Sequence, residues 1–171
     1  MADTMTPEQR HRCMSHIRGK NTKPEILVRK YLFAQGLRFR IHKKNLPGHP
    51  DITLPKYKIV IFINGCFWHG HPRCKLATVP KSNTEFWLAK IHRNQERDLQ
   101  EKTQLEEMGW KVIVIWECEL KKKVFDETMQ RLMAEIKNPA AQIYELPDQV
   151  ISIAAEEESS YSDNQDSISS L

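Results

Sequence analysis

Three cysteines and one histidine in this chain have the residue types and the spacing of metal ligands. Cys66, His71 and Cys74 fall within one short loop, and Cys118 follows much later. Thiolates and imidazoles are the ligands that zinc prefers in a tetrahedral site. Four protein ligands leave no open coordination position, so the predicted site is structural rather than catalytic. The alternative is that the cysteines are buried as apolar residues and that His71 lies at the surface.

Two apolar runs must bring these ligands together. Residues 59–63 (Ile-Val-Ile-Phe-Ile) lead directly into the loop, and residues 112–116 (Val-Ile-Val-Ile-Trp) end shortly before Cys118. Both runs have the length and the β-branched composition of strands. The four ligands can therefore converge where two neighbouring strands end.

Two residues near this loop could act on a phosphate. Asp51 begins a predicted strand, where a carboxylate can hold Mg²⁺ together with water and substrate phosphate. A Pro-Asp pair also commonly begins an ordinary turn. His69 lies between the predicted zinc ligands and could take a proton from a water molecule. It could equally be an unused alternative zinc ligand or have no role.

Aromatic side chains around the loop are candidates for DNA contact. Phe67 and Trp68 belong to the loop, and Trp87 falls in the first turn of a predicted long helix. Apolar wedges beside basic residues can unstack a base step. Packing in a core around the zinc is the competing interpretation of the same rings.

The long helix carries a polar stripe. Lys90, Asn94 and Asp98 recur every four residues and therefore share one helix face. Lys and Asn side chains suit base edges in a DNA groove, whereas a solvated face is the commoner use of such a stripe.

The pattern along the chain predicts one mixed α/β domain. Helices are expected over residues 7–17, from a capping box at 22–25 to about residue 36, from a capping box at 82–85 to residue 108, and over 124–137. The second of these should present Ile26, Leu27, Tyr31 and Leu32 on one face. Strands are expected at 39–41, 51–54, 58–63 and 111–116, the last apolar enough to be central in the sheet. Helices packed on a mixed central sheet are the expected architecture.

Charge divides the chain into a basic and an acidic part. All 26 Lys and Arg residues fall within residues 1–137, which carry a net charge of about +11, whereas residues 138–171 hold seven acids and no base. A basic domain suits a polyanionic partner, with nucleic acid as the first candidate. The acidic, Ser-rich tail is predicted to be disordered toward its end. We expect neither a signal peptide nor a membrane span, and four cysteines indicate a reduced, cytoplasmic protein.

Several motifs together resemble the very-short-patch mismatch repair endonucleases, the Vsr family, over residues 7 to about 137. The matching motifs are Leu-Pro-Gly-His-Pro-Asp at 46–51, Gly-Cys-Phe-Trp-His at 65–69, Thr-Glu-Phe-Trp-Leu at 84–88, Asn94 with Glu-Arg-Asp at 96–98, and Val-Ile-Trp-Glu-Cys at 114–118. The resemblance implies a bacterial, cytoplasmic enzyme with a restriction-endonuclease-like core. It would nick DNA on the 5′ side of the thymine in a T:G mismatch, where 5-methylcytosine has been deaminated. We expect a monomer that cooperates with the mismatch repair machinery.

The resemblance also implies roles for individual residues. Asp51 and the main-chain carbonyl of Ile63 would hold a catalytic Mg²⁺, His69 would act as the base, and Glu25 and Asp98 would support the site. Cys66, His71, Cys74 and Cys118 would hold the structural Zn²⁺. Phe67, Trp68 and Trp87 would enter the DNA beside the mismatch, while Lys90 and Asn94 would face the mispair. Residues 1–21 would form a DNA-contacting arm before an endonuclease domain at 22–137.

This chain departs from the family pattern in places. Ile63 and Asn64 stand where family members can carry Thr and His, and one extra residue separates His71 from Cys74. A main-chain carbonyl ligand at position 63 tolerates the first change. The second removes an imidazole beside the scissile phosphate. Alternatives to mismatch nicking are a nuclease of the same fold with another mispair or sequence specificity, and a zinc-dependent DNA-binding module that does not cleave.

Overall fold

A computed structural model describes residues 6–16 and 19–138, which belong to one compact unit, Met1–Ala141. A second unit, Gln142–Leu171, lies outside the described residues, and with it almost all of the predicted acidic tail. The described elements follow in the order α1 (Pro7–Ser15), α2 (Lys23–Ala34), β1 (Ile52–Leu54), β2 (Ile59–Asn64), α3 (Thr84–Glu107), β3 (Lys111–Trp116) and α4 (Phe125–Lys137).

The described strands form one mixed sheet with the order β1-β2-β3. The tight turn Pro55–Tyr57 makes β1 and β2 antiparallel, whereas helix α3 connects β2 to β3 as parallel neighbours. The expected strand at 39–41 was wrong, because only a single bridge joins Arg40 to Thr53. The expectation that residues 111–116 lie centrally was also wrong, because β2 is the middle strand.

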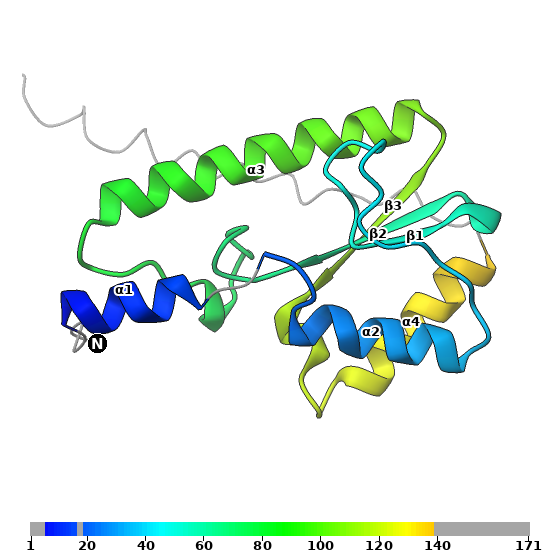
Figure 1. Ribbon diagram of the computed structural model, residues 1–171, viewed down its shortest axis with the longest axis horizontal. Helices are drawn as coiled ribbons and strands as arrows, with labels where there is room; N and C mark the ends of the chain where they lie inside the picture. Colours follow the sequence, from blue (N-terminus) through cyan, green and yellow to red (C-terminus); the bar gives the residue numbers. More distant parts are fainter. Residues whose placement is uncertain (1–5, 17–18, 139–171) are drawn as a thin grey trace, which may run out of the picture. The chain divides into compact units, whose positions relative to one another are not determined.

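Helices cover both faces of this sheet. Helices α2 and α4 pack on one face and α3 packs on the other (Figure 1). The first core packs Val28 and Leu32 of α2 and Met129 of α4 against alternate residues of the strands, among them Ile61 and Ile113. The second core places Leu105 and Trp110 against the opposite residues of the sheet, Val60 and Val112. This alternation is the period-two pattern of strands, so each apolar run serves two cores at once.

Side-chain hydrogen bonds define where helices α1 and α2 begin. Thr22 and Glu25 exchange side-chain and backbone hydrogen bonds at α2, so the capping box predicted at residues 22–25 is confirmed, and Thr6 and Gln9 do the same at α1. The box expected at residues 82–85 was wrong. Helix α3 begins one residue later, after Asn83, whose side chain makes no capping bond. No helix in the described ranges is both long enough and apolar enough to cross a membrane.

Candidate metal centre and active site

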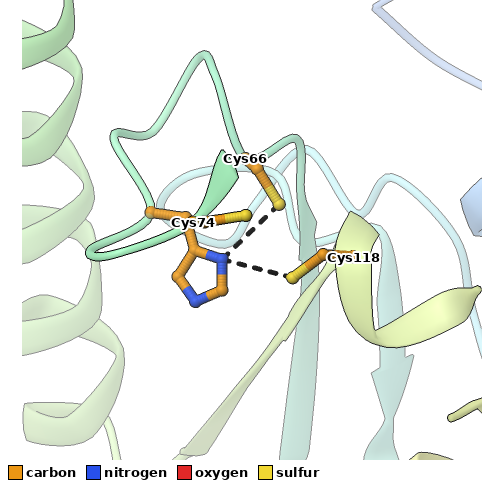
Figure 2. A group of neighbouring side chains, drawn as sticks. Cys66, Cys74 and Cys118 are labelled. Carbon is orange, nitrogen blue, oxygen red and sulfur yellow. Dashed lines mark hydrogen bonds between the residues drawn. The ribbon is translucent and has the colours of Figure 1, made fainter. Parts of the chain in front are cut away.

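The four predicted zinc ligands lie together at one edge of the sheet. Their ligand atoms are all within 4.8 Å of one another, and the Nδ1 atom of His71 lies 3.5 Å from the sulfur of Cys66 and 3.3 Å from that of Cys118 (Figure 2). A tetrahedral zinc with ordinary bond lengths separates a sulfur and a nitrogen ligand by about 3.6 Å. The donor set and its spacing therefore fit a zinc ion.

Strand register explains why ligands far apart in sequence meet. Asn64 pairs with Trp116 at the ends of the parallel strands β2 and β3, so Cys66 and Cys118 follow the same edge of the sheet. The ring of Trp116 stacks on that of His71 with the ring centroids 4.1 Å apart. This stacking fixes the plane of the imidazole and directs Nδ1 toward the thiols.

The loop between Cys66 and Cys74 (the ligand loop) is held by backbone contacts. The amide of His71 donates to the carbonyl of Cys66, and Gln95 of α3 donates at 3.4 Å to the carbonyls of both His69 and Gly70. Gly70 has φ +60°, and a side chain there would come within 2.6 Å of Gln95 and 2.7 Å of Ile91. The loop therefore needs glycine at position 70 to pack against α3.

The thiols differ in their electrostatic environment. Burial raises the pKa of Cys66 to about 12 and also raises the pKa of Cys118, whereas the backbone N–H of Leu76 lowers the pKa of Cys74. Burial lowers the pKa of His71, which favours the neutral imidazole that a metal requires. A bound dication would hold the buried thiols as thiolates, so these residues suit a resident metal better than an empty cluster.

We expect one zinc ion per chain in the purified protein. Cys118→Ser should remove the zinc and lower the free energy of unfolding by about 4 kcal/mol or more, because loss of a structural metal is among the largest single-site effects. Elemental analysis and denaturant unfolding measure the two quantities.

Cys13→Ser is the control for this prediction, because it makes the same substitution at a cysteine that does not belong to the predicted ligand set. It should retain the zinc. Well-folded protein without zinc would contradict the assignment.

A second cluster gathers Glu25 of α2, His42 and Asp51, whose ligand atoms also lie within 4.8 Å of one another. Asp51 precedes β1, and its Oδ2 atom accepts a 2.8 Å hydrogen bond from the amide of Ile63 near the end of β2. Burial, reinforced by the charge of Glu25, raises the pKa of Asp51 to about 6. Two carboxylates at one sheet edge form a hard oxygen donor set of the kind Mg²⁺ prefers.

His69 and Asp98 form a hydrogen-bonded pair of their own. The Nδ1 atom of His69 is hydrogen bonded to a carboxylate oxygen of Asp98 on α3. Because an ionised carboxylate only accepts, Nδ1 donates in this hydrogen bond, which makes Nε2 the nitrogen with the lone pair in the neutral ring. The charge of a protonated His69 acts to lower the pKa of Asp51, so the two predicted catalytic residues lie close enough to interact electrostatically.

The three predicted wedge residues form one aromatic group. Phe67, Trp68 and Trp87 meet edge to face, with ring centroids 5.1 to 6.1 Å apart, and Phe86 extends the group at 5.2 Å from Trp87. All of the first three are partly exposed, and Phe86 is 56% exposed. These rings pack on one another rather than inside either hydrophobic core.

The two residues predicted to face the mispair are placed differently. Lys90 is exposed on α3, whereas Asn94 is only 9% exposed and donates a 2.8 Å hydrogen bond to the carbonyl of Trp68. In this conformation the Asn94 amide braces the ligand loop.

Four residues that complete these sites were not predicted from the sequence. Gln95 and Trp116 hold the ligand loop and His71, while His42 and Arg29 complete the second cluster. One signal was available, since Arg29 follows Glu25 by four residues on a helix, a spacing that favours ion pairs. His42 belongs to an irregular segment, where no periodicity predicts a contact.

Comparison with known proteins shows which proteins this chain is related to. Residues 2–75 match the profile of the family described as DNA mismatch endonuclease Vsr. The chain is 54% identical over 139 residues to the Type II nicking enzyme V.NmeAIP of Neisseria meningitidis serogroup A, which covers 81% of this chain and 99% of the relative. It is 47% identical over 120 residues to the Type II nicking enzyme V.XorIIP of Xanthomonas oryzae pv. oryzae, covering 70% and 88%. It is 42% identical over 137 residues to the DNA mismatch endonuclease Vsr of Escherichia coli K12, covering 79% and 87%.

These relationships show that the protein is a DNA endonuclease. More narrowly, the chain belongs to the Vsr family, as its motifs predicted.

Proposed function

We propose that this protein is a Mg²⁺-dependent endonuclease that nicks one DNA strand on the 5′ side of the thymine in a T:G mismatch. The main support is the hydrogen-bonded pair of His69 and Asp98, together with the Glu25–His42–Asp51 cluster, whose Asp51 interacts electrostatically with His69. A carboxylate cluster next to an oriented imidazole is the arrangement that hydrolysis of a phosphodiester needs. A DNA-binding module without cleavage would have no use for it.

In this proposal the carboxylates form the metal-binding site. Asp51 would bind Mg²⁺ directly, together with the carbonyl of Ile63, whose peptide already lies beside Asp51 through the 2.8 Å hydrogen bond. Glu25 would support the site from α2. Bound magnesium would supply positive charge at the phosphate oxygens. The position of Asp51 at the edge of a mixed sheet also supports the proposal of a restriction-endonuclease-like core.

His69 supplies the proton transfer. Its Nε2 atom would accept a proton from the attacking water, and Asp98 would stabilise the imidazolium that forms. The products would be a 3′-hydroxyl and a 5′-phosphate. The zinc-binding ligand loop would keep His69 in place, because Cys66 and His71 flank it in sequence and Gln95 binds its carbonyl.

The aromatic group would find the mismatch. A T:G pair costs less to unstack than a matched pair, so Phe67, Trp68 and Trp87 could enter that base step preferentially. The exposed Lys90 lies on the same helix as Trp87 and could reach the opened pair. We also propose residues 1–21 as a DNA-contacting arm of the endonuclease domain at 22–137.

A second candidate is a nicking endonuclease with another mispair or sequence specificity. The supporting observation is that the relatives from N. meningitidis and X. oryzae are both named Type II nicking enzymes. The catalytic residues would have the same roles, and only the contacts that select the site would differ.

Nicking of a set of labelled duplexes tests the proposal. In Mg²⁺, we expect a single nick in the thymine strand of a T:G duplex, roughly 100-fold faster than in matched T:A or C:G duplexes, because opening a mispair saves a few kcal/mol. Chelation of Mg²⁺ should stop the reaction. Equal nicking of matched and mismatched duplexes in one flanking sequence would overturn the T:G assignment and favour the second candidate.

A further inference from the structure

Arg29 of α2 occupies the cation position of the Glu25–His42–Asp51 cluster. Its Nη2 atom lies 2.5 Å from Oε2 of Glu25, 3.1 Å from Nε2 of His42 and 3.4 Å from the carbonyl oxygen of Asp51. Glu25 is only 3% exposed, so its charge must be compensated from within the protein. One guanidinium nitrogen therefore meets all three residues of the cluster.

His42 presents a lone pair toward this position. A guanidinium has no acceptor, so the contact with Arg29 requires Nε2 of His42 to be unprotonated. The residue has φ +45°, an uncommon conformation for a non-glycine residue, which the surroundings must enforce. An imidazole lone pair held beside two carboxylates is a ready ligand for a divalent cation.

One hydrogen-bond donor of the Arg29 side chain lacks a partner among the described residues. Its Nη1 atom donates to Asn21 at 2.7 Å, but its buried Nε atom has no hydrogen-bond partner among the described residues. Leaving a buried donor unpaired is unfavourable, and a permanent structural arginine usually satisfies all its donors. The contacts of Arg29 thus resemble those of a replaceable counter-ion.

We propose that Arg29 is an internal cation that competes with the catalytic divalent metal, and that His42 joins Glu25 and Asp51 as a metal ligand once Arg29 withdraws. This inference rests on the proposed metal-dependent function. In the absence of metal, Arg29 neutralises the buried carboxylates and keeps the cluster assembled. A divalent metal must then displace the Arg29 guanidinium, and this exchange sets the affinity of the site for metal.

Binding of Mn²⁺ to the zinc-loaded, full-length protein tests the inference in the absence of DNA. Electron paramagnetic resonance of free Mn²⁺ gives the Kd directly. Arg29→Gln should tighten Mn²⁺ binding by roughly 10- to 100-fold, because a competing charge in contact with the ligands is removed. Added Mn²⁺ should also raise the melting temperature of this variant by more than that of the wild type.

Two further variants complete the experiment. Arg38→Gln makes the same charge change at an exposed arginine over the ring of Phe33, and it should leave the Kd for Mn²⁺ unchanged. His42→Ala should weaken Mn²⁺ binding by roughly 10-fold or more, because it removes a ligand. It also provides a test if Arg29→Gln does not fold.

An unchanged Kd for Mn²⁺ in folded Arg29→Gln, or in His42→Ala, would overturn the inference. Neither outcome affects the T:G nicking assay with wild-type protein, so the proposed function can stand when this inference fails. Conversely, a wild-type protein that binds Mn²⁺ as described but nicks no duplex would refute the proposed function alone.

Discussion

Asp51→Asn is expected to lower the rate of nicking of a T:G duplex by at least about 10³-fold. Asp51 is the carboxylate most directly placed to bind Mg²⁺, and the positive charge of a metal at a phosphate is worth several kcal/mol in the transition state. The fold should survive, because asparagine keeps an oxygen that can accept the 2.8 Å hydrogen bond from Ile63. Single-turnover nicking in saturating enzyme measures the effect.

Binding separates a catalytic role for Asp51 from a structural one. The variant should bind a mismatched duplex as tightly as the wild type or slightly more tightly, because it loses a negative charge near the phosphates. Asp126→Asn, at an exposed residue in the first turn of α4, is the matched control and should nick normally. An Asp51→Asn protein that nicks at the wild-type rate would remove Asp51 from the active site.

The sequence predicted that the four candidate zinc ligands lie together, and the pairing of two strands explains why. Parallel neighbours β2 and β3 end together, so residues placed just after each strand must meet. Cys66 and Cys118 satisfy that condition, and His71 and Cys74 are close to Cys66 in the chain. Nothing more than the order of the strands was needed to bring these four residues together.

The position of β3 was misjudged for a physical reason. Its apolar run was interpreted as the mark of a central strand, but it reflects cover by helices on both faces. Ile113 and Ile115 face the core of α2 and α4, whereas Val112 faces Leu105 of α3. An edge strand that is covered on both faces has the same composition as a central strand, so hydropathy alone does not separate them.

Helix α2 shows a related limit. The expected apolar face included Ile26 and Leu27, yet both are 40% exposed, while Val28 and Leu32 are fully buried. The buried face runs through Glu25 instead, so a carboxylate occupies a core position. Hydrophobicity patterns assign such a residue to the surface. Its burial makes sense only with Arg29, His42 and Asp51 around it, and His42 comes from a segment whose path no local pattern predicts.

His69→Ala is expected to lower the nicking rate by roughly 10²- to 10⁴-fold, the usual contribution of a general base. The hydrogen bond from Nδ1 to Asp98 leaves Nε2 as the basic nitrogen, and the candidate ligands Cys66 and His71 flank His69 in sequence. Removing the side chain leaves metal-dependent charge stabilisation intact, so some activity should remain. Zinc content and duplex binding should not change, because His69 is outside the zinc cluster.

Asp98→Asn tests the orientation of the same imidazole without removing it. The asparagine amide can donate to Nδ1, which would move the proton to Nε2 and block the base. A loss of roughly 10- to 100-fold is expected, as for other residues that orient a functional histidine. His92→Ala, at an exposed histidine of α3 that pairs with Glu96, is the control and should nick at the wild-type rate. If His69→Ala is as active as His92→Ala, the proton leaves the attacking water by another route, and His69 serves only to shape the loop.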